Sequence, residues 1–290
     1  MDFDIWSISI ILAKFIGYIF TFIAVGTFLF TQLLKPDARI ISIPFSLLAI
    51  IFAILASLAL IPLNVGLFND EGIAGMFDYQ MALVIIDSPI GTNTMTRISG
   101  LALLLICFYL RGKSQKIIGL VASLLVTWSF TQMGHLSNIE PALAKLVLMI
   151  HLLSIAFWVG AFAPLYRAAS GIIALPDAAD LSHRFGQLAL YIVGALFVAG
   201  VVMSFILLGN PSQLLTSEYG QTLGIKILLF FSLLSLAALN KLRLVPGLKA
   251  GQTDAAIKLR RSIALEIGIV SAILVATAIL TTVTQLPAHH

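Results

Sequence analysis

Long apolar runs alternate with short polar segments along the whole chain. About 20 consecutive apolar residues are needed for a helix to cross roughly 30 Å of hydrocarbon. The runs predict eight membrane-spanning helices, over residues 8–33, 42–63, 95–110, 117–133, 144–166, 187–208, 221–242 and 262–282. They are too long and too uniformly apolar for the strands of a membrane barrel. We therefore expect an all-α polytopic membrane bundle, with residues 1–290 forming a single transmembrane domain.

Basic residues predict how these helices are oriented. Thirteen of the 17 Lys and Arg residues lie in the loops after the first, third, fifth and seventh predicted helices. Cytoplasmic loops carry an excess of Lys and Arg, so we expect these loops in the cytoplasm and both termini in the periplasm. The long outer segment 64–93 mixes apolar and acidic residues. We interpret part of it as an interfacial or re-entrant helix.

Composition excludes several classes of protein. Hydrophobic residues make up 60% of the chain and charged residues 10%, which is unlike a soluble globular domain. The net charge of +4 comes from residues in short loops, so we expect no nucleic-acid partner. The sequence contains no phosphate-binding P-loop, so we expect no nucleotide. The single cysteine, Cys107, lies in an apolar run, where we expect it to be a packing residue.

Ionisable side chains inside a membrane are functional candidates by default. His135 follows the fourth predicted helix at the outer surface, and His151 lies about six residues into the fifth, roughly 9 Å deep. Trp158 is seven residues after His151 and shares its helix face. Met133 and Met203 lie near the same outer level. His135 can equally be an ordinary solvated residue, and the methionines can be apolar fillers.

Other polar residues interrupt the apolar runs. Arg97 lies in the third predicted helix, and Lys226 lies in the seventh at a depth similar to that of His151. A lysine at this depth can also extend to the surface without a functional role. Glu266 lies about one turn into the eighth helix from the cytoplasmic end, at the level of Asn240. We expect Glu266 to pair with one of three nearby basic residues: Lys241, Arg243 or Arg261.

Several short motifs occur in order along the chain. In the second half they are residues 183–189, 219–220, 240–246 and 260–262, and upstream they are residues 134–135, 151–153 and 158–160. With these motifs the chain resembles the CopD family of bacterial inner-membrane copper proteins, which includes the PcoD and YcnJ relatives. The resemblance is strongest over residues 181–287. The first three predicted helices resemble the family only as generic apolar helices.

The resemblance implies a non-enzymatic, multi-pass protein of the bacterial inner membrane that moves copper, inward, in copper homeostasis or resistance. It also implies a separate periplasmic copper carrier of the CopC type as partner. Imidazole and thioether groups suit copper, and thioether suits Cu(I) especially. The candidate ligands for Cu(I) or Cu(II) are His135, His151, Met133 and Met203. The candidate gating or pathway residues are Trp158, Lys226, Asn240, Glu266 and Arg97.

Two alternatives use the same residues differently. In the first, the protein is a membrane redox protein in which His135 and His151 hold a b-type haem, which needs two histidines on facing helices at similar depth. In the second, it is an assembly factor that hands copper to another membrane protein. The positive charge of Lys226 argues against a simple funnel for cations, since it would repel a bound ion unless it is neutralised or paired.

Overall fold

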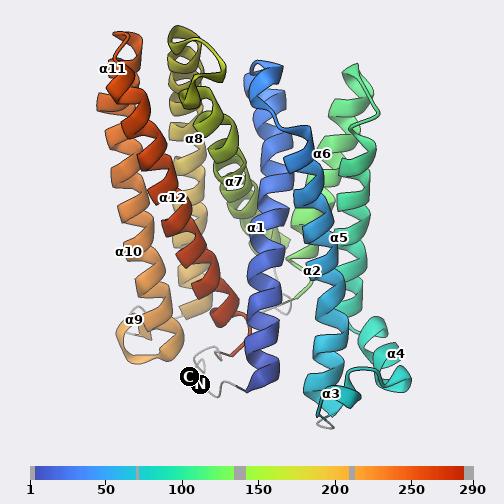
Figure 1. The fold of residues 1–290 in the computed structure, drawn as a ribbon. Coiled ribbons are helices and arrows are strands. Elements are labelled where there is room, and N and C mark those ends of the chain that lie inside the picture. Colours follow the sequence, from blue (N-terminus) through green and yellow to red (C-terminus); the bar gives the residue numbers. More distant parts are fainter. Residues whose placement is uncertain (1–3, 70–71, 134–141, 209–212, 284–290) are drawn as a thin grey trace.

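The computed structural model describes residues 4–69, 72–133, 142–208 and 213–283, and these form helices without strands. Eight of these helices are long (Figure 1). They are α1 (Ile5–Leu34), α2 (Ile43–Asn69), α5 (Pro89–Ile106), α6 (Gly112–Ser129), α7 (Ala142–Arg167), α8 (Leu175–Leu208), α10 (Glu218–Leu239) and α12 (Thr253–Leu280). Each overlaps one of the predicted runs, which confirms the all-α bundle.

Six of these helices are long and apolar enough to cross a membrane, namely α1, α2, α7, α8, α10 and α12. The other two, α5 and α6, have 18 residues each. They are more polar, because α5 carries Asn93 and Arg97 and α6 begins with Lys113 and Lys116 close together. That α5 and α6 also cross the membrane, giving eight spans, stays a prediction.

The two ends of the bundle differ. α1 begins and α12 ends at one end, which we call the terminal end (Figure 1). The short helices α3 (Gly72–Gly75), α4 (Tyr79–Asp87) and α9 (Gln213–Thr216) lie there too. The opposite end, the basic end, holds η1 (Ala38–Ile40), η2 (Ala168–Ile172), η3 (Asn240–Leu244) and α11 (Val245–Lys249). α4 packs against α2 and α5 and exposes apolar side chains, as expected of an interfacial helix.

Three helices begin six or more residues earlier than the apolar runs predict, and one of them is α12, which begins at Thr253 rather than residue 262. α5 begins at Pro89 rather than residue 95, because the Ser88 hydroxyl accepts a hydrogen bond from the Ile90 backbone N–H and proline suits the first helical position. α8 begins at Leu175 rather than residue 187. Its first turns are polar and carry the Asp180–Arg184 ion pair, with the Nε and Oδ2 atoms 2.9 Å apart.

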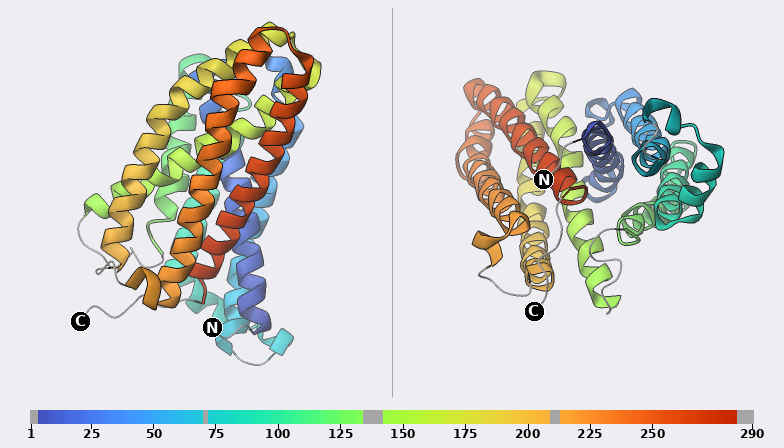
Figure 2. Two further views of the ribbon diagram at one scale, coloured as in Figure 1. Left: turned by 90° about the vertical axis from the view of Figure 1, so that its left-hand side faces the viewer. Right: turned by 90° about the horizontal axis from the view of Figure 1, so that it is seen from below.

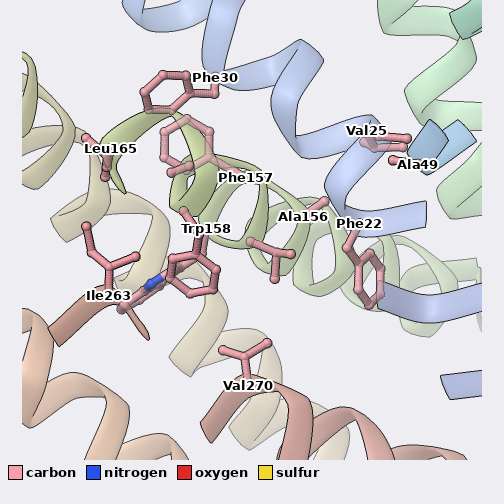
Figure 3. Close-up of a cluster of buried hydrophobic side chains, with 14 of the residues drawn as sticks. Phe22, Val25, Phe30, Ala49, Ala156, Phe157, Trp158, Leu165, Ile263 and Val270 are labelled. Carbon is pink, nitrogen blue, oxygen red and sulfur yellow. The ribbon is translucent and has the colours of Figure 1, made fainter. Parts of the chain in front are cut away.

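α1 occupies the centre of the bundle. It lies between a group formed by α7, α8, α10 and α12 and a group formed by α2, α5 and α6 (Figure 2). α1 and α7 approach closely at Gly26 and Gly160, where a Cβ atom on either glycine would overlap backbone atoms of the other helix. Small residues allow such close contact between membrane helices. Around this contact Phe22, Phe157 and Trp158 are buried in the core (Figure 3).

The outward faces of α8 and α10 are apolar. Their large exposed side chains include Leu190, Tyr191, Val198, Ile225, Leu228 and Leu239. A surface patch of this kind is unfavourable in water but matches the hydrocarbon of a bilayer. Together with the six long apolar helices, it identifies the chain as a multi-pass membrane protein.

Candidate functional site

A cavity of about 620 Å³ lies inside the bundle and has walls from α1, α2, α5, α7, α8, α10 and α12. Six of the nine residues singled out in the sequence line it, namely Arg97, Met133, His151, Trp158, Met203 and Lys226. The structure therefore brings residues from five separate segments to one space. His135 lies outside the described residues. Asn240 and Glu266 are not part of the cavity wall.

The imidazole of His151 faces α8. A Cβ atom on Gly200 would lie 3.7 Å from its Cε1 atom, so the glycine leaves room for the ring. The Nδ1 atom is buried and has no hydrogen-bond partner among the described residues. Buried polar atoms are normally paired, and an imidazole nitrogen without a partner is free to bind a ligand.

Trp158 connects the cavity to a buried carboxylate. Its indole Nε1 donates a hydrogen bond of 3.2 Å to Oε2 of Glu266, which is 4% exposed. The amide Nδ2 of Asn240 donates to Oε1 of the same carboxylate, over 2.5 Å. Trp158, Asn240 and Glu266 thus form one hydrogen-bonded cluster beneath the cavity wall, drawn from α7, η3 and α12.

The prediction that Glu266 forms an ion pair with a nearby basic residue is wrong. In the described parts of the chain, Glu266 forms no salt bridge with Lys241, Arg243 or Arg261. Asn240 faces α12 and donates to Glu266, while the Lys241 ammonium donates to the Gly186 carbonyl of α8 over 3.2 Å.

Arg97 is buried, with 4% of its surface exposed. Its Nη2 donates to Oδ1 of Asn93 over 2.8 Å, and its Nε donates to the Ser129 hydroxyl over 3.1 Å. The guanidinium also lies 4.0 Å above the Phe130 ring centroid, a cation–π contact. All these partners are neutral, so none of them offsets the charge of Arg97.

Lys14 is a cavity residue that sequence reasoning missed. Its Nζ donates to the Thr281 carbonyl over 2.7 Å and to the Thr282 hydroxyl over 3.0 Å. The nearby Tyr18 hydroxyl lies 3.2 Å from the Thr281 hydroxyl. The signal was present, since a charged residue within an apolar run is a functional candidate.

The cavity wall offers a metal one imidazole and two thioethers, and thioethers are soft donors. Within the described residues, no group of three or more His, Cys, Asp and Glu side chains is placed to hold an ion. Cys107 is buried away from the cavity, with its Sγ 3.8 Å from the Gln115 carbonyl, consistent with a packing role. A metal here would depend on the His151 imidazole and the Met133 and Met203 thioethers, a set suited to Cu(I).

Comparisons with known proteins agree with this chemistry. Residues 4–145 match the family "Copper resistance protein D-like, N-terminal domain", and residues 179–280 match the family "Copper resistance protein D". The chain is 31% identical over 121 residues to the copper transport protein CutJ of Bacillus subtilis (strain 168). No solved structure matches it significantly.

The share of each chain that a match covers determines how much can be concluded from it. The match to CutJ covers 40% of this chain but only 22% of CutJ. The N-terminal match includes the first three predicted helices, so the likeness to the family reaches beyond residues 181–287. Together the matches support a role in copper transport or resistance, and they point to a transporter rather than an enzyme. The chain belongs to the CopD family of copper resistance proteins.

Proposed function

We propose that this protein moves copper ions inward across the bacterial inner membrane and that the cavity is where copper enters the protein. The observation that carries the proposal is that Met133, His151 and Met203 all line one cavity. His135 is a further candidate ligand. Neutral imidazole and thioether donors bind Cu(I) without adding charge inside the membrane.

A route from the cavity toward the basic end is supported by the cluster at Glu266. Trp158 lines the cavity and donates to Glu266, which also accepts from Asn240 at the start of η3. We propose that Trp158 separates the cavity from this cluster and that copper leaves past Glu266 and Asn240. With the basic end in the cytoplasm, this route runs inward.

A partner that delivers copper would meet the terminal end. Exposed acidic side chains lie there, among them Asp78 and Asp87 beside α4. Acidic groups raise the local concentration of cations. We propose that a periplasmic copper carrier of the CopC type docks at this end.

The experiment is copper uptake into liposomes that contain only this protein, measured for the wild type and for His151→Ala. We expect uptake by the variant to fall by about tenfold or more, because the loss of a group that only supports a ligand already weakens a metal site by about 10- to 100-fold. His183→Ala is the matched control, since His183 lies on α8 outside the cavity. Equal uptake by all three proteins would exclude the cavity as the transport site.

Two other results obtained with the purified protein would favour a different function. Tight copper binding without uptake would favour the assembly factor that hands copper to another protein. A b-type haem protein is a second candidate function, because His151 lies on the wall of a mainly apolar cavity of about 620 Å³. A Soret band in the absorption spectrum of protein purified from membranes would favour it, provided that His151→Ala removes the band.

A further inference from the structure

The cavity contains more positive charge than copper transport explains. Lys14, Arg97 and Lys226 line it together with His151. Each of the four lies eight or nine residues beyond the first residue of its helix, which is about 12–14 Å along the helix. A cation at such a depth is unfavourable unless an opposite charge or a set of dipoles compensates it.

These groups also act on one another. Arg97 is close enough to Lys14 for the two charges to repel each other. Like charges in a mainly apolar space repel each other more strongly than they would in water. The wall of the cavity is therefore unfavourable for a free cation and favourable for an anion.

The described residues supply no negative charge to this wall. No Asp or Glu side chain is among those that line the cavity. The hydrogen bonds of Lys14 go to a carbonyl and a hydroxyl of Thr281 and Thr282, and those of Arg97 go to an amide oxygen and a hydroxyl. The described structure shows no hydrogen bond to the Lys226 ammonium.

The rest of the wall is apolar. It includes Phe22, Leu152, Phe197, Phe231 and Leu274. Its volume of about 620 Å³ falls within the range of about 300–1,000 Å³ that is usual for pockets holding an organic molecule. A small inorganic anion would leave most of this apolar surface without contacts, whereas an apolar body would fill it.

We propose that the cavity binds an amphipathic organic anion, a carboxylate on a large apolar body, with the carboxylate at the neighbouring cations Lys14 and Arg97. Hydrogen bonds from a charged donor to a carboxylate are stronger than those to neutral groups. The inference goes beyond copper transport and does not depend on it. It also accounts for the positive wall, because the bound anion offsets the charge that copper would otherwise meet.

Trp158 provides a local reporter, since it lines the cavity. The chain has three tryptophans, so Trp6→Phe and Trp128→Phe leave Trp158 as the only one. This protein, washed with a copper chelator, is placed in phosphatidylcholine nanodiscs and titrated with 9,10-dibromostearate, whose bromines quench tryptophan at short range. The methyl ester of the same acid is the uncharged probe of equal chain length.

We expect half-quenching at a concentration about tenfold lower for the acid than for the ester, a ratio that one charge-assisted hydrogen bond can produce. Arg97→Gln and Lys14→Gln, each tested separately, should reduce this ratio at least threefold. Lys116→Gln is the matched control, because Lys116 is exposed at the other end of the bundle and should leave the ratio unchanged. Comparing acid with ester within each variant removes the effect of any general loss of packing.

Equal quenching by acid and ester in the wild type would overturn the proposal, and so would a ratio that survives both substitutions. Acetate that displaces the acid as well as unbrominated stearate does would overturn the need for an apolar body. The natural ligand is then identified in an organic extract of the purified protein. A fatty acid or a tetrapyrrole carboxylate in that extract supports the proposal, and an extract free of both contradicts it.

Discussion

At the scale of single residues, the depth of a side chain in the membrane could be predicted, but its direction could not. Hydropathy placed His151, Met133 and Met203 at one level, and the structure places them around one cavity. The same reasoning gave Glu266 the wrong partners, because depth does not fix the angle around a helix. Lys14 was not recognised as a candidate site residue. It is a single charge within a long apolar run that is otherwise typical of a membrane-spanning helix.

The hydrogen bond from Trp158 to Glu266 predicts a specific effect of Trp158→Phe. Phenylalanine keeps most of the apolar contact but removes the indole N–H, so Glu266 loses one of its two donors. We expect the variant to lose about 1–3 kcal/mol of stability, the range for a buried polar group left without a partner, seen as a lower Tm in detergent. Trp128→Phe is the control, because Trp128 is 41% exposed on α6. An equal Tm for the two variants would show that the bond is not formed.

At the scale of helices, local signals refine what hydropathy predicts. The apolar run alone placed the start of α5 at residue 95, because Asn93 and Thr94 are polar. Both side chains are buried against protein rather than lipid, at 4% and 1% exposure. The Ser88 cap and Pro89 mark the true start and are readable from the sequence. The close contact of α1 with α7 was not predictable, because it depends on two glycines from distant segments facing each other.

That contact predicts the effect of Gly160→Ala. The added Cβ would overlap the backbone of Gly26, and forced overpacking destabilises a core by about 1–3 kcal/mol. We expect a lower Tm and, because α7 carries His151 and Trp158, weaker copper uptake. Gly268→Ala is the matched control within a helix, since a Cβ there meets no atom within 4 Å. Alanine at residue 268 should stabilise the helix slightly. If both variants have the wild-type Tm, α1 and α7 do not pack in this way.

At the scale of the whole molecule, the charge pattern and the arrangement of the helices agree. The helix termini nearest the chain ends share one end of the bundle, and the basic loops share the other (Figures 1 and 2). An even number of crossings gives this arrangement. Charge and hydropathy predict it together because both act on whole segments and do not depend on single side-chain contacts.

The orientation is testable with single cysteines, because Cys107 is the only cysteine in the chain. In a Cys107→Ser background, Asp87→Cys places an exposed thiol at the terminal end and Lys113→Cys places one at the basic end. We expect a membrane-impermeant maleimide to label Asp87→Cys in intact spheroplasts. Lys113→Cys should react only after the membrane is permeabilised. The reverse pattern would mean that the termini face the cytoplasm and that the proposed direction of transport is inverted.

The central claim is that copper binds to His151 in the cavity. Anomalous scattering at the copper absorption edge, from crystals of copper-loaded protein, tests it most directly. We expect a single strong peak within bonding distance of the His151 imidazole and of Met133 or Met203, and its loss in His151→Ala. A copper peak outside the cavity, or one in the cavity that His151→Ala leaves unchanged, would contradict the account.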